Sequence, residues 1–233
     1  CSGFKELKAK VMEYPPEKAS KICGISADVI RDLARELASV KPAMLMYTLG
    51  ITEHTCGVNN VLSCANLQML LGNVGFECGG VNPIRGQNNV QGACDMGALP
   101  NVFHAYQRVD NPEIRAKFEK AWNVKDLPAK PGLMLPQMFD AIGQGKIKGF
   151  YVFGENLANT EPDIRHVEHC LKSVEFLVCQ DIFPTETTKF AHVILPAAAW
   201  SENDGTFTSS ERRVNRVRTA HPAPGDAKPN WWI

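Results

Sequence analysis

Apolar residues recur at helical spacing in four segments of the chain. After Ser26 they occupy positions 29, 30, 33, 34 and 37, which predicts a helix that Ser26-Ala27-Asp28 caps and Pro42 ends. The same spacing predicts helices over residues 58–71, 112–122 and 135–143, with Asn111 as the cap of the helix over 112–122.

Short apolar runs without helical spacing predict buried strands over residues 43–47, 149–153, 174–179 and 192–195. Helices are expected between the last three strands, over residues 160–171 and 185–190. Strands that alternate with helices are typical of a parallel sheet with helices on its faces, so the expected fold class is α/β. Weak alternation over residues 206–217 predicts an edge strand or an extended arm.

The segment between residues 75 and 97 differs from its surroundings. It is rich in glycine and carboxamide side chains and has little apolar periodicity, which predicts a long loop. A loop of this length in a compact domain is usually functional or disordered. Its composition is not typical of disorder, so we expect a functional loop.

Composition excludes several classes of protein. The chain has 233 residues with 44% hydrophobic and 21% charged residues, which are globular values. Its 25 basic and 25 acidic residues leave no net charge, so no electrostatic signal for nucleic acid or an anionic membrane is present. No apolar run is long enough to predict a spanning helix.

The eight cysteines are irregularly spaced and form no CxxC motif, so we expect neither a zinc ribbon nor an iron–sulfur motif but reduced thiols. His166 and His169, next to Cys170, have a spacing that could bind a metal, but no third ligand is evident, which favours a surface histidine pair. Cys94-Asp95 could supply a nucleophile, but no base lies beside it.

Polar clusters follow three of the predicted strands, at Gly50–Thr55, Gly154–Asn156 and Gln180-Asp181. Ligands of parallel sheets bind beyond the carboxyl ends of strands, and glycines there let backbone N–H groups approach a ligand. An aspartate there can accept two hydrogen bonds from a guanine or ribose edge. The three clusters together favour a nucleotide-like ligand, while the absence of a GxGxxG motif disfavours an ordinary nicotinamide site.

Arg85 is the strongest single candidate in the glycine-rich segment. Its guanidinium fork matches a carboxylate with two hydrogen bonds, and Gly86 removes side-chain bulk beside it. The neighbouring amides of Gln87, Asn88, Asn89 and Gln91 suit a heterocycle with donors and acceptors. A solvated loop is the alternative reading. Likewise, the arginines between 212 and 218 predict either a solvated arm or a pyrophosphate contact.

Together these segments resemble one family. The run Val81-Asn-Pro-Ile-Arg85-Gly-Gln-Asn-Asn-Val-Gln-Gly-Ala-Cys-Asp-Met-Gly97 is similar to the signature loop of molybdenum- or tungsten-dependent formate dehydrogenases, within the molybdopterin oxidoreductase superfamily. Later blocks of the family are matched in order by residues 178–187, 191–196 and 205–213. The resemblance covers nearly the whole chain.

The resemblance implies part of a catalytic alpha subunit that binds two molybdopterin guanine dinucleotides around one Mo or W. It implies that residues 1–87 and 88–233 are parts of two Rossmann-like, molybdopterin-binding α/β domains. By match, Arg85 would orient the formate carboxylate, Gly86 and Gln87 would face the pterin, and the loop at Gly50 would touch one cofactor. The residues implied to hold a guanosine end are Gly154, Glu155, Asn156, Gln180, Asp181 and Thr185.

The chain also departs from the family pattern. The cysteines for a [4Fe–4S] cluster and the Cys or selenocysteine metal ligand with its adjacent histidine are missing, so no metal ligand is assigned and the chain is expected to be an internal fragment, inactive alone. The expected partners are formate or CO2 and electron-transfer subunits or a ferredoxin-like acceptor. The expected location is cytoplasmic, with the periplasm left open. The alternatives are an inactive structural subunit of a redox complex and, less favoured, a nicotinamide-dependent dehydrogenase.

Overall fold

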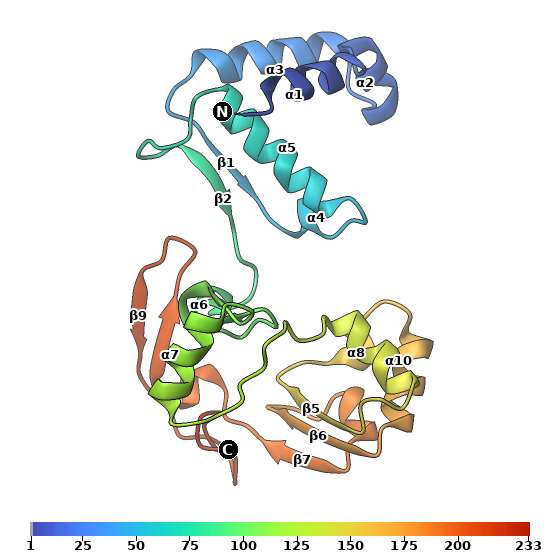
Figure 1. The fold of residues 1–233 in the computed structure, drawn as a ribbon, viewed down its shortest axis with the longest axis vertical. Helices are drawn as coiled ribbons and strands as arrows, with labels where there is room; N and C mark the ends of the chain where they lie inside the picture. Colours follow the sequence, from blue (N-terminus) through green and yellow to red (C-terminus); the bar gives the residue numbers. More distant parts are fainter. Residues whose placement is uncertain (1) are drawn as a thin grey trace. The chain divides into compact units, whose positions relative to one another are not determined.

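A computed structural model describes residues 2–233. The chain divides into two compact units, Cys1–Gly86 (unit 1) and Gln87–Ile233 (unit 2). Figure 1 traces the elements of each unit in sequence order.

Unit 1 combines helices with one pair of parallel strands. In β1 and β2, Met44 pairs with Gly80 and Tyr47 pairs with Pro83, and α5 packs against both strands. The elements of unit 1 are α1 (Phe4–Met12), α2 (Pro16–Cys23), α3 (Ala27–Ser39), β1 (Met44–Tyr47), α4 (Leu49–Thr52), α5 (Gly57–Leu70) and β2 (Gly80–Pro83).

The interior of unit 1 is small and polar. Among residues 2–86 only Gly57, Gln68 and Asn73 are buried. Asn73 Nδ2 donates to Gln68 Oε1 at 2.9 Å, and Asn73 Oδ1 accepts from Ala43 N at 3.3 Å, which ties the end of α5 to the start of β1. Unit 1 therefore keeps its apolar side chains at least partly exposed.

Unit 2 contains a three-stranded parallel sheet, two antiparallel strand pairs and short helices. Its helices are α6 (Val90–Asp95), η1 (His104–Tyr106), α7 (Pro112–Trp122), α8 (Leu135–Gly143), α9 (Leu157–Thr160), α10 (Ile164–Ser173), η2 (Thr187–Phe190) and η3 (Trp200–Glu202). Its strands are β3 (Val102–Phe103), β4 (Gln107–Arg108), β5 (Gly149–Phe153), β6 (Phe176–Asp181), β7 (Val193–Pro196), β8 (Gly205–Thr208) and β9 (Val214–Val217).

The parallel sheet has the order β5-β6-β7 and carries the main core. Val152 pairs with Cys179, and both side chains point toward helices α8 and α10, which lie together beside the sheet (Figure 1). Alternation along β5 and β6 places Tyr151 and Phe153, each more than half exposed, on the other face. The core consists of Phe139, Ile142, Val152, Leu157, Ala158, Val167, Cys170, Leu171, Val174, Leu177 and Cys179.

Most predicted elements are confirmed. The predicted helices at 58–71, 112–122 and 135–143 correspond to α5, α7 and α8, and the four predicted strands correspond to β1, β5, β6 and β7. The cap of α3 is confirmed because Ser26 Oγ accepts from Val29 N at 3.3 Å. The α/β fold class is confirmed, since helices alternate with strands and both the β1–β2 pair and the β5-β6-β7 sheet are parallel.

Other predictions are wrong in detail. The loop predicted for 75–97 contains β2 and α6, and the helix predicted for 160–171 is broken into α9 and α10. Gln180 and Asp181 form the end of β6 itself. Strand β2 has the sequence Gly-Val-Asn-Pro, which carries no strand pattern, and it forms through its pairing with β1.

We expect Leu177→Ala to destabilise the chain by about 2–5 kcal/mol, because Leu177 is fully buried between β6 and the helices and truncation leaves a cavity. Ile194→Ala is the matched control on the neighbouring strand β7, where the side chain is 50% exposed, and its effect should stay within about 0.5 kcal/mol. Urea unfolding measures both. Equal losses of stability in the two variants would contradict the described core.

The core thiols Cys170 and Cys179 should resist alkylation, since burial raises the pKa of both thiols above the ordinary range. Cys23, Cys56 and Cys78 are exposed and should react with iodoacetamide at pH 8 in the folded chain. Mass spectrometry of labelled peptides, with a urea-unfolded sample as control, measures the difference. Labelling of Cys170 as fast as Cys56 would argue against this packing.

Candidate functional site

The carboxyl ends of β5 and β6 lie side by side and gather most of the predicted binding residues. Phe153 is opposite Gln180 in the parallel register, and Gly154 N donates to Gln180 O at 2.8 Å. Gly154 has φ +63° and no heavy atom within 4 Å of the position that a Cβ would take. The sheet therefore brings Gly154–Asn156 next to Gln180-Asp181, as the sequence predicts.

Both polar atoms of the Asn156 amide form hydrogen bonds within the protein. Its Oδ1 accepts from Thr187 N at 3.2 Å and from Thr187 Oγ1 at 2.9 Å. Its Nδ2 donates to Glu186 Oε2 at 2.7 Å, a hydrogen bond that lowers the pKa of that carboxyl. Thr187 is fully buried and its Oγ1 also accepts from Ala158 N. Asn156 thus ties the turn after β5 to η2.

Gln180 is also engaged inside the protein. It is 3% exposed, its Oε1 accepts from the Tyr151 hydroxyl, and its Nε2 donates to Asn230 Oδ1 at 2.9 Å. Tyr151 and Asn230 were not singled out by the sequence, because each lies far from Gln180 along the chain. The amide of Gln180 fixes the end of β6 and is not directed at solvent.

Asp181, Glu155 and Thr185 are the more accessible members of the group. Asp181 is half-buried, and Ile182 N donates to its Oδ1 at 2.7 Å. Glu155 is exposed and accepts from Thr160 Oγ1 at 3.1 Å. Thr185 Oγ1 accepts from Thr188 N at 3.4 Å, which closes the turn before η2. Two carboxylates therefore flank this end of the sheet.

Negative charge accumulates at the same edge. The pKa of the Glu161 carboxyl is raised, mainly by burial and further by the charge of Glu155. An edge of this kind favours a ligand that donates hydrogen bonds and disfavours a bare phosphate.

Arg85 follows the end of β2 in unit 1. Ile84 N donates to Tyr47 O at 2.8 Å, so the pairing with β1 extends to the residue before Arg85. Arg85 and Gly86 are exposed, and Gln87, the first residue of unit 2, is exposed too. The three predicted residues are thus contiguous and solvent-accessible at the junction of the two units along the chain.

Gly50 lies within the short helix α4, where a loop was expected. It is exposed, and its carbonyl oxygen is 2.9 Å from His54 Nε2. Gly50 belongs to unit 1, whereas the residues at the end of β5 and β6 belong to unit 2.

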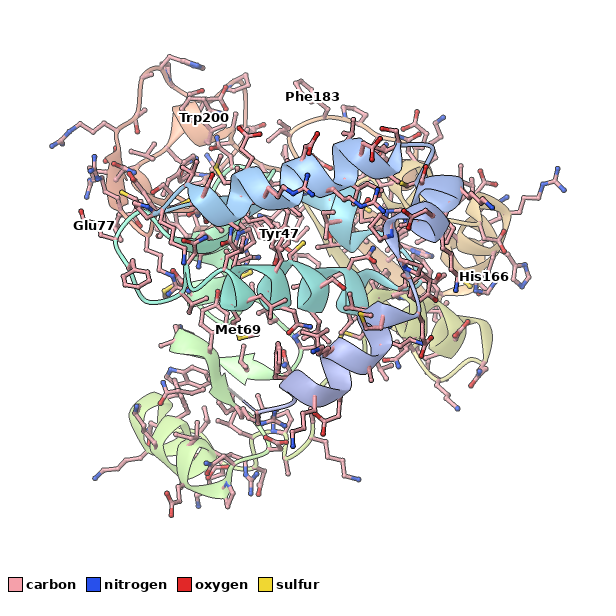
Figure 2. All side chains as sticks on the ribbon, turned by 90° about the horizontal axis from the view of Figure 1, so that it is seen from above. Tyr47, Met69, Glu77, His166, Phe183 and Trp200 are labelled. Atoms are coloured by element: carbon pink, nitrogen blue, oxygen red, sulfur yellow. The ribbon has the colours of Figure 1, made fainter. Side chains whose placement is uncertain are left out.

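His166 and Cys170 form no metal site. Cys170 Sγ lies 3.7 Å from His166 Nε2, which is also 3.7 Å from Asp140 Oδ1. Cys170 is fully buried and donates to Phe139 O at 3.3 Å. No group of three or more possible metal ligands occurs within residues 2–233. Figure 2 shows the side chain of His166 on α10.

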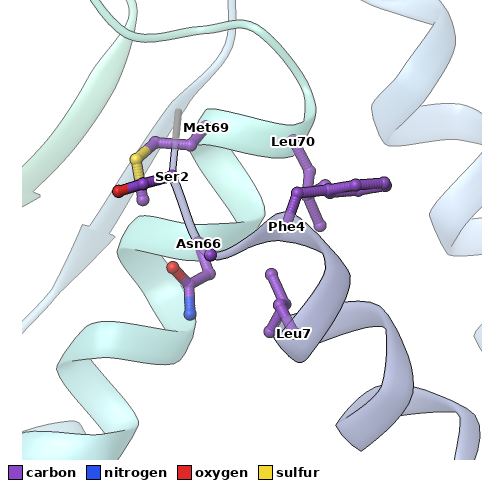
Figure 3. A pocket seen from close by; sticks show the side chains of 7 residues that line it. Ser2, Phe4, Leu7, Asn66, Met69 and Leu70 are labelled. Carbon is purple, nitrogen blue, oxygen red and sulfur yellow. The ribbon is translucent and has the colours of Figure 1, made fainter.

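A pocket of about 490 Å³ lies in unit 1 between α1 and α5. Figure 3 shows its lining, which has no titratable side chain and includes none of the predicted site residues. The lining residues are Ser2, Gly3, Phe4, Leu7, Asn66, Met69 and Leu70.

Comparisons with known proteins bear on these observations. The family model of the molybdopterin oxidoreductases matches residues 5–233. The chain is 52% identical, over 99% of its length, to the F420-dependent formate dehydrogenase 2 subunit alpha of Methanococcus maripaludis and covers 34% of that protein. It is 41% identical, also over 99% of its length, to formate dehydrogenase H of Escherichia coli and covers 32% of it. The chain spans about a third of the length of these relatives.

Acetylene hydratase from Pelobacter acetylenicus has a similar structure, with a TM-score of 0.72 and 19% identity, and the match covers all of this chain and 34% of that one. At this identity the similarity concerns the fold alone. Within residues 2–233 no helix has the length and apolarity that crossing a membrane requires. The resemblance of the glycine-rich segment, the matched family model and the shared fold agree, and the chain belongs to the molybdopterin oxidoreductase family.

Proposed function

We propose that this chain is part of the catalytic subunit of a formate dehydrogenase, which oxidises formate reversibly to CO2 at a Mo or W centre held by two molybdopterin guanine dinucleotides. The observation that carries the proposal is the 52% identity, over 99% of the chain, to a formate dehydrogenase alpha subunit. The exposed Arg85-Gly86-Gln87 segment supports it, since it offers a guanidinium fork beside a residue without a side chain.

Members of this family use a molybdopterin cofactor with Mo or W. We assign residues 1–87 and 88–233 to parts of two molybdopterin-binding domains. Gly86 and Gln87 face a pterin, and the loop at Gly50 touches one cofactor. The [4Fe–4S] cluster of the proposed enzyme would be bound by other residues, since no cysteine cluster occurs within the described part of this chain.

The guanine end of one cofactor is assigned to the carboxyl ends of β5 and β6. The residues there fit that group: Asp181 is half-buried and offers a carboxylate, and no heavy atom lies within 4 Å of the position that a Cβ of Gly154 would take. A carboxylate can accept both N–H groups on the edge of guanine. The negative charge of Glu155 at this edge suits a hydrogen-bond donor better than a phosphate.

Within this assignment the residues divide into two roles. Asp181, Glu155 and Thr185 face the nucleoside. Asn156 and Gln180, whose amides are committed to Thr187, Glu186, Tyr151 and Asn230, hold the ends of β5 and β6 in place.

The chemistry of formate sets the role of Arg85. Formate becomes CO2 when its C–H bond breaks, with release of one proton and two electrons. When bound, the metal and its pterins supply the two-electron redox chemistry. Arg85 holds the substrate: two parallel N–H donors bind the two carboxylate oxygens, neutralise their charge and fix the direction of the C–H bond. Gly86 leaves the space that a bound anion needs.

An inactive structural subunit of a redox complex is the second candidate. The Arg85-Gly86-Gln87 segment disfavours it, because a scaffold has no use for an exposed anion-binding fork. The proposed enzyme is cytoplasmic and passes electrons to another subunit or a ferredoxin-like acceptor. Three relatives with 49–52% identity are F420-dependent formate dehydrogenase alpha subunits, which favours F420 as an electron acceptor.

Arg85→Lys should reduce kcat/KM for formate by roughly 10- to 100-fold in the complete enzyme, because a single ammonium cannot reproduce a charge-assisted pair of parallel hydrogen bonds. Arg165→Lys, at an exposed position of α10, is the control and should leave the rate unchanged. Turnover of Arg85→Lys at the level of Arg165→Lys would remove Arg85 from substrate binding.

The purified complete enzyme should contain Mo or W and release guanine nucleotide on acid hydrolysis, whereas a structural subunit would contain neither.

Asp181→Asn should lower the amount of nucleotide that the enzyme retains, since the loss of a charged acceptor weakens the affinity for the nucleotide by about 10-fold or more. Asp226→Asn, at an exposed position, is the control. Full retention in Asp181→Asn would exclude this carboxylate from the guanine site.

A further inference from the structure

The segment that carries Arg85 lies at the surface. Residues 84 to 88 are all exposed, whereas Asn89 is half-buried and Gln91 and Gly92 are buried. Asn89 is therefore the residue at which the exposed segment enters the packed part of unit 2. It lies four residues after Arg85 and two after Gln87.

Asn89 makes a contact that its position would not lead one to expect. It precedes α6 with left-handed backbone (φ 59°), yet its side chain does not cap that helix. Its Oδ1 instead accepts from Thr208 N at 3.0 Å, at the end of β8 and 119 residues further along the chain. The side chain of an asparagine at a helix start normally accepts from the first free N–H groups of its own helix. Here that local hydrogen bond is absent, and the bond from Thr208 N takes its place.

Gly92 makes this contact possible. A Cβ at position 92 would overlap Asn89 Oδ1 and lie 3.2 Å from Thr208 Oγ1. Any side chain at position 92 would displace the Asn89 amide from Thr208.

The elements on which Asn89 rests are themselves held firmly. Gln91 Nε2 donates to Asp95 Oδ1 at 2.8 Å and to the Tyr106 hydroxyl at 3.2 Å. Asp95 Oδ1 is also 3.8 Å from Arg212 Nη1, on the turn between β8 and β9. These contacts link α6 to η1 and to the β8–β9 hairpin, the same hairpin to which Asn89 is hydrogen-bonded.

We propose that Asn89 is a positioning residue for the Arg85–Gln87 segment, which it anchors to β8 through the backbone N–H of Thr208. The proposal rests on the proposed function, in which Arg85 binds formate. Fixing one end of an exposed segment restricts the conformations that its backbone can take, which favours those in which the guanidinium is aligned with the substrate. A loss of this anchor should therefore weaken substrate binding and alignment more than it weakens the fold.

The test uses the complete enzyme with Asn89→Gly, Asn89→Asp and Gly92→Ala. Glycine accepts the left-handed backbone and removes only the side chain, while aspartate keeps both the backbone preference and the acceptor. Gly92→Ala displaces the Asn89 amide without altering Asn89. Asn111→Ala is the matched control, because Asn111 Oδ1 caps α7 by accepting from Glu113 N and Ile114 N and serves stability alone.

Two readouts are needed. Hydrogen exchange measured on the β8 peptide should show faster exchange at the Thr208 amide in Asn89→Gly and Gly92→Ala but not in Asn89→Asp. In the same two variants kcat/KM for formate, per bound metal, should fall about 3- to 10-fold, which is the size expected for one lost hydrogen bond. Asn89→Asp should restore it to within about twofold. Asn111→Ala should lower the melting temperature but leave kcat/KM unchanged.

Unchanged kcat/KM in Asn89→Gly, together with an unprotected Thr208 amide, would overturn the positioning role and leave the proposed function intact. A Thr208 amide that stays protected in Asn89→Gly would overturn the anchor itself. If the unsubstituted enzyme oxidises no formate, the proposed function fails, and the positioning role of Asn89 fails with it. The exchange experiment measures only the hydrogen bond to Thr208, so its result does not depend on the proposed function.

Discussion

The parallel pairing of β5, β6 and β7 is the constraint on which the candidate cofactor site depends. Parallel strands end at the same edge of a sheet, so the register that places Phe153 opposite Gln180 also places Gly154 and Asp181 side by side. The register is held by side chains such as Leu177, which a shift of one residue would turn away from the helices. A packing requirement in the core thus determines which polar groups meet at the edge.

The sequence predicted the elements whose apolar pattern is strong. Helices α3, α5, α7 and α8 and the strands of the three-stranded sheet all have clear spacing and were found near their expected bounds. Strand β2 and helix α6 were missed because their residues pair or pack with distant segments and carry no local pattern. The same reason explains why η1, with left-handed backbone at Ala105 and Tyr106, was not foreseen.

The sequence predicted where the candidate site lies better than it predicted what each of its residues does. The sequence grouped Asn156 and Gln180 with Asp181 because all three follow or end strands. Only the three-dimensional contacts separate a carboxylate that is accessible from two amides that are used to hold strand ends. The partners of those amides, Thr187 and Asn230, are remote in sequence, so no spacing rule could have identified them.

The Asn89 amide occupies the space that a side chain at position 92 would take, so the residues at positions 89 and 92 depend on each other. A family member that gains a methyl group at the second position loses the room for the amide at the first, and a small residue at the first removes the need for glycine at the second. Substitutions at the two sites should therefore be correlated across evolutionary time.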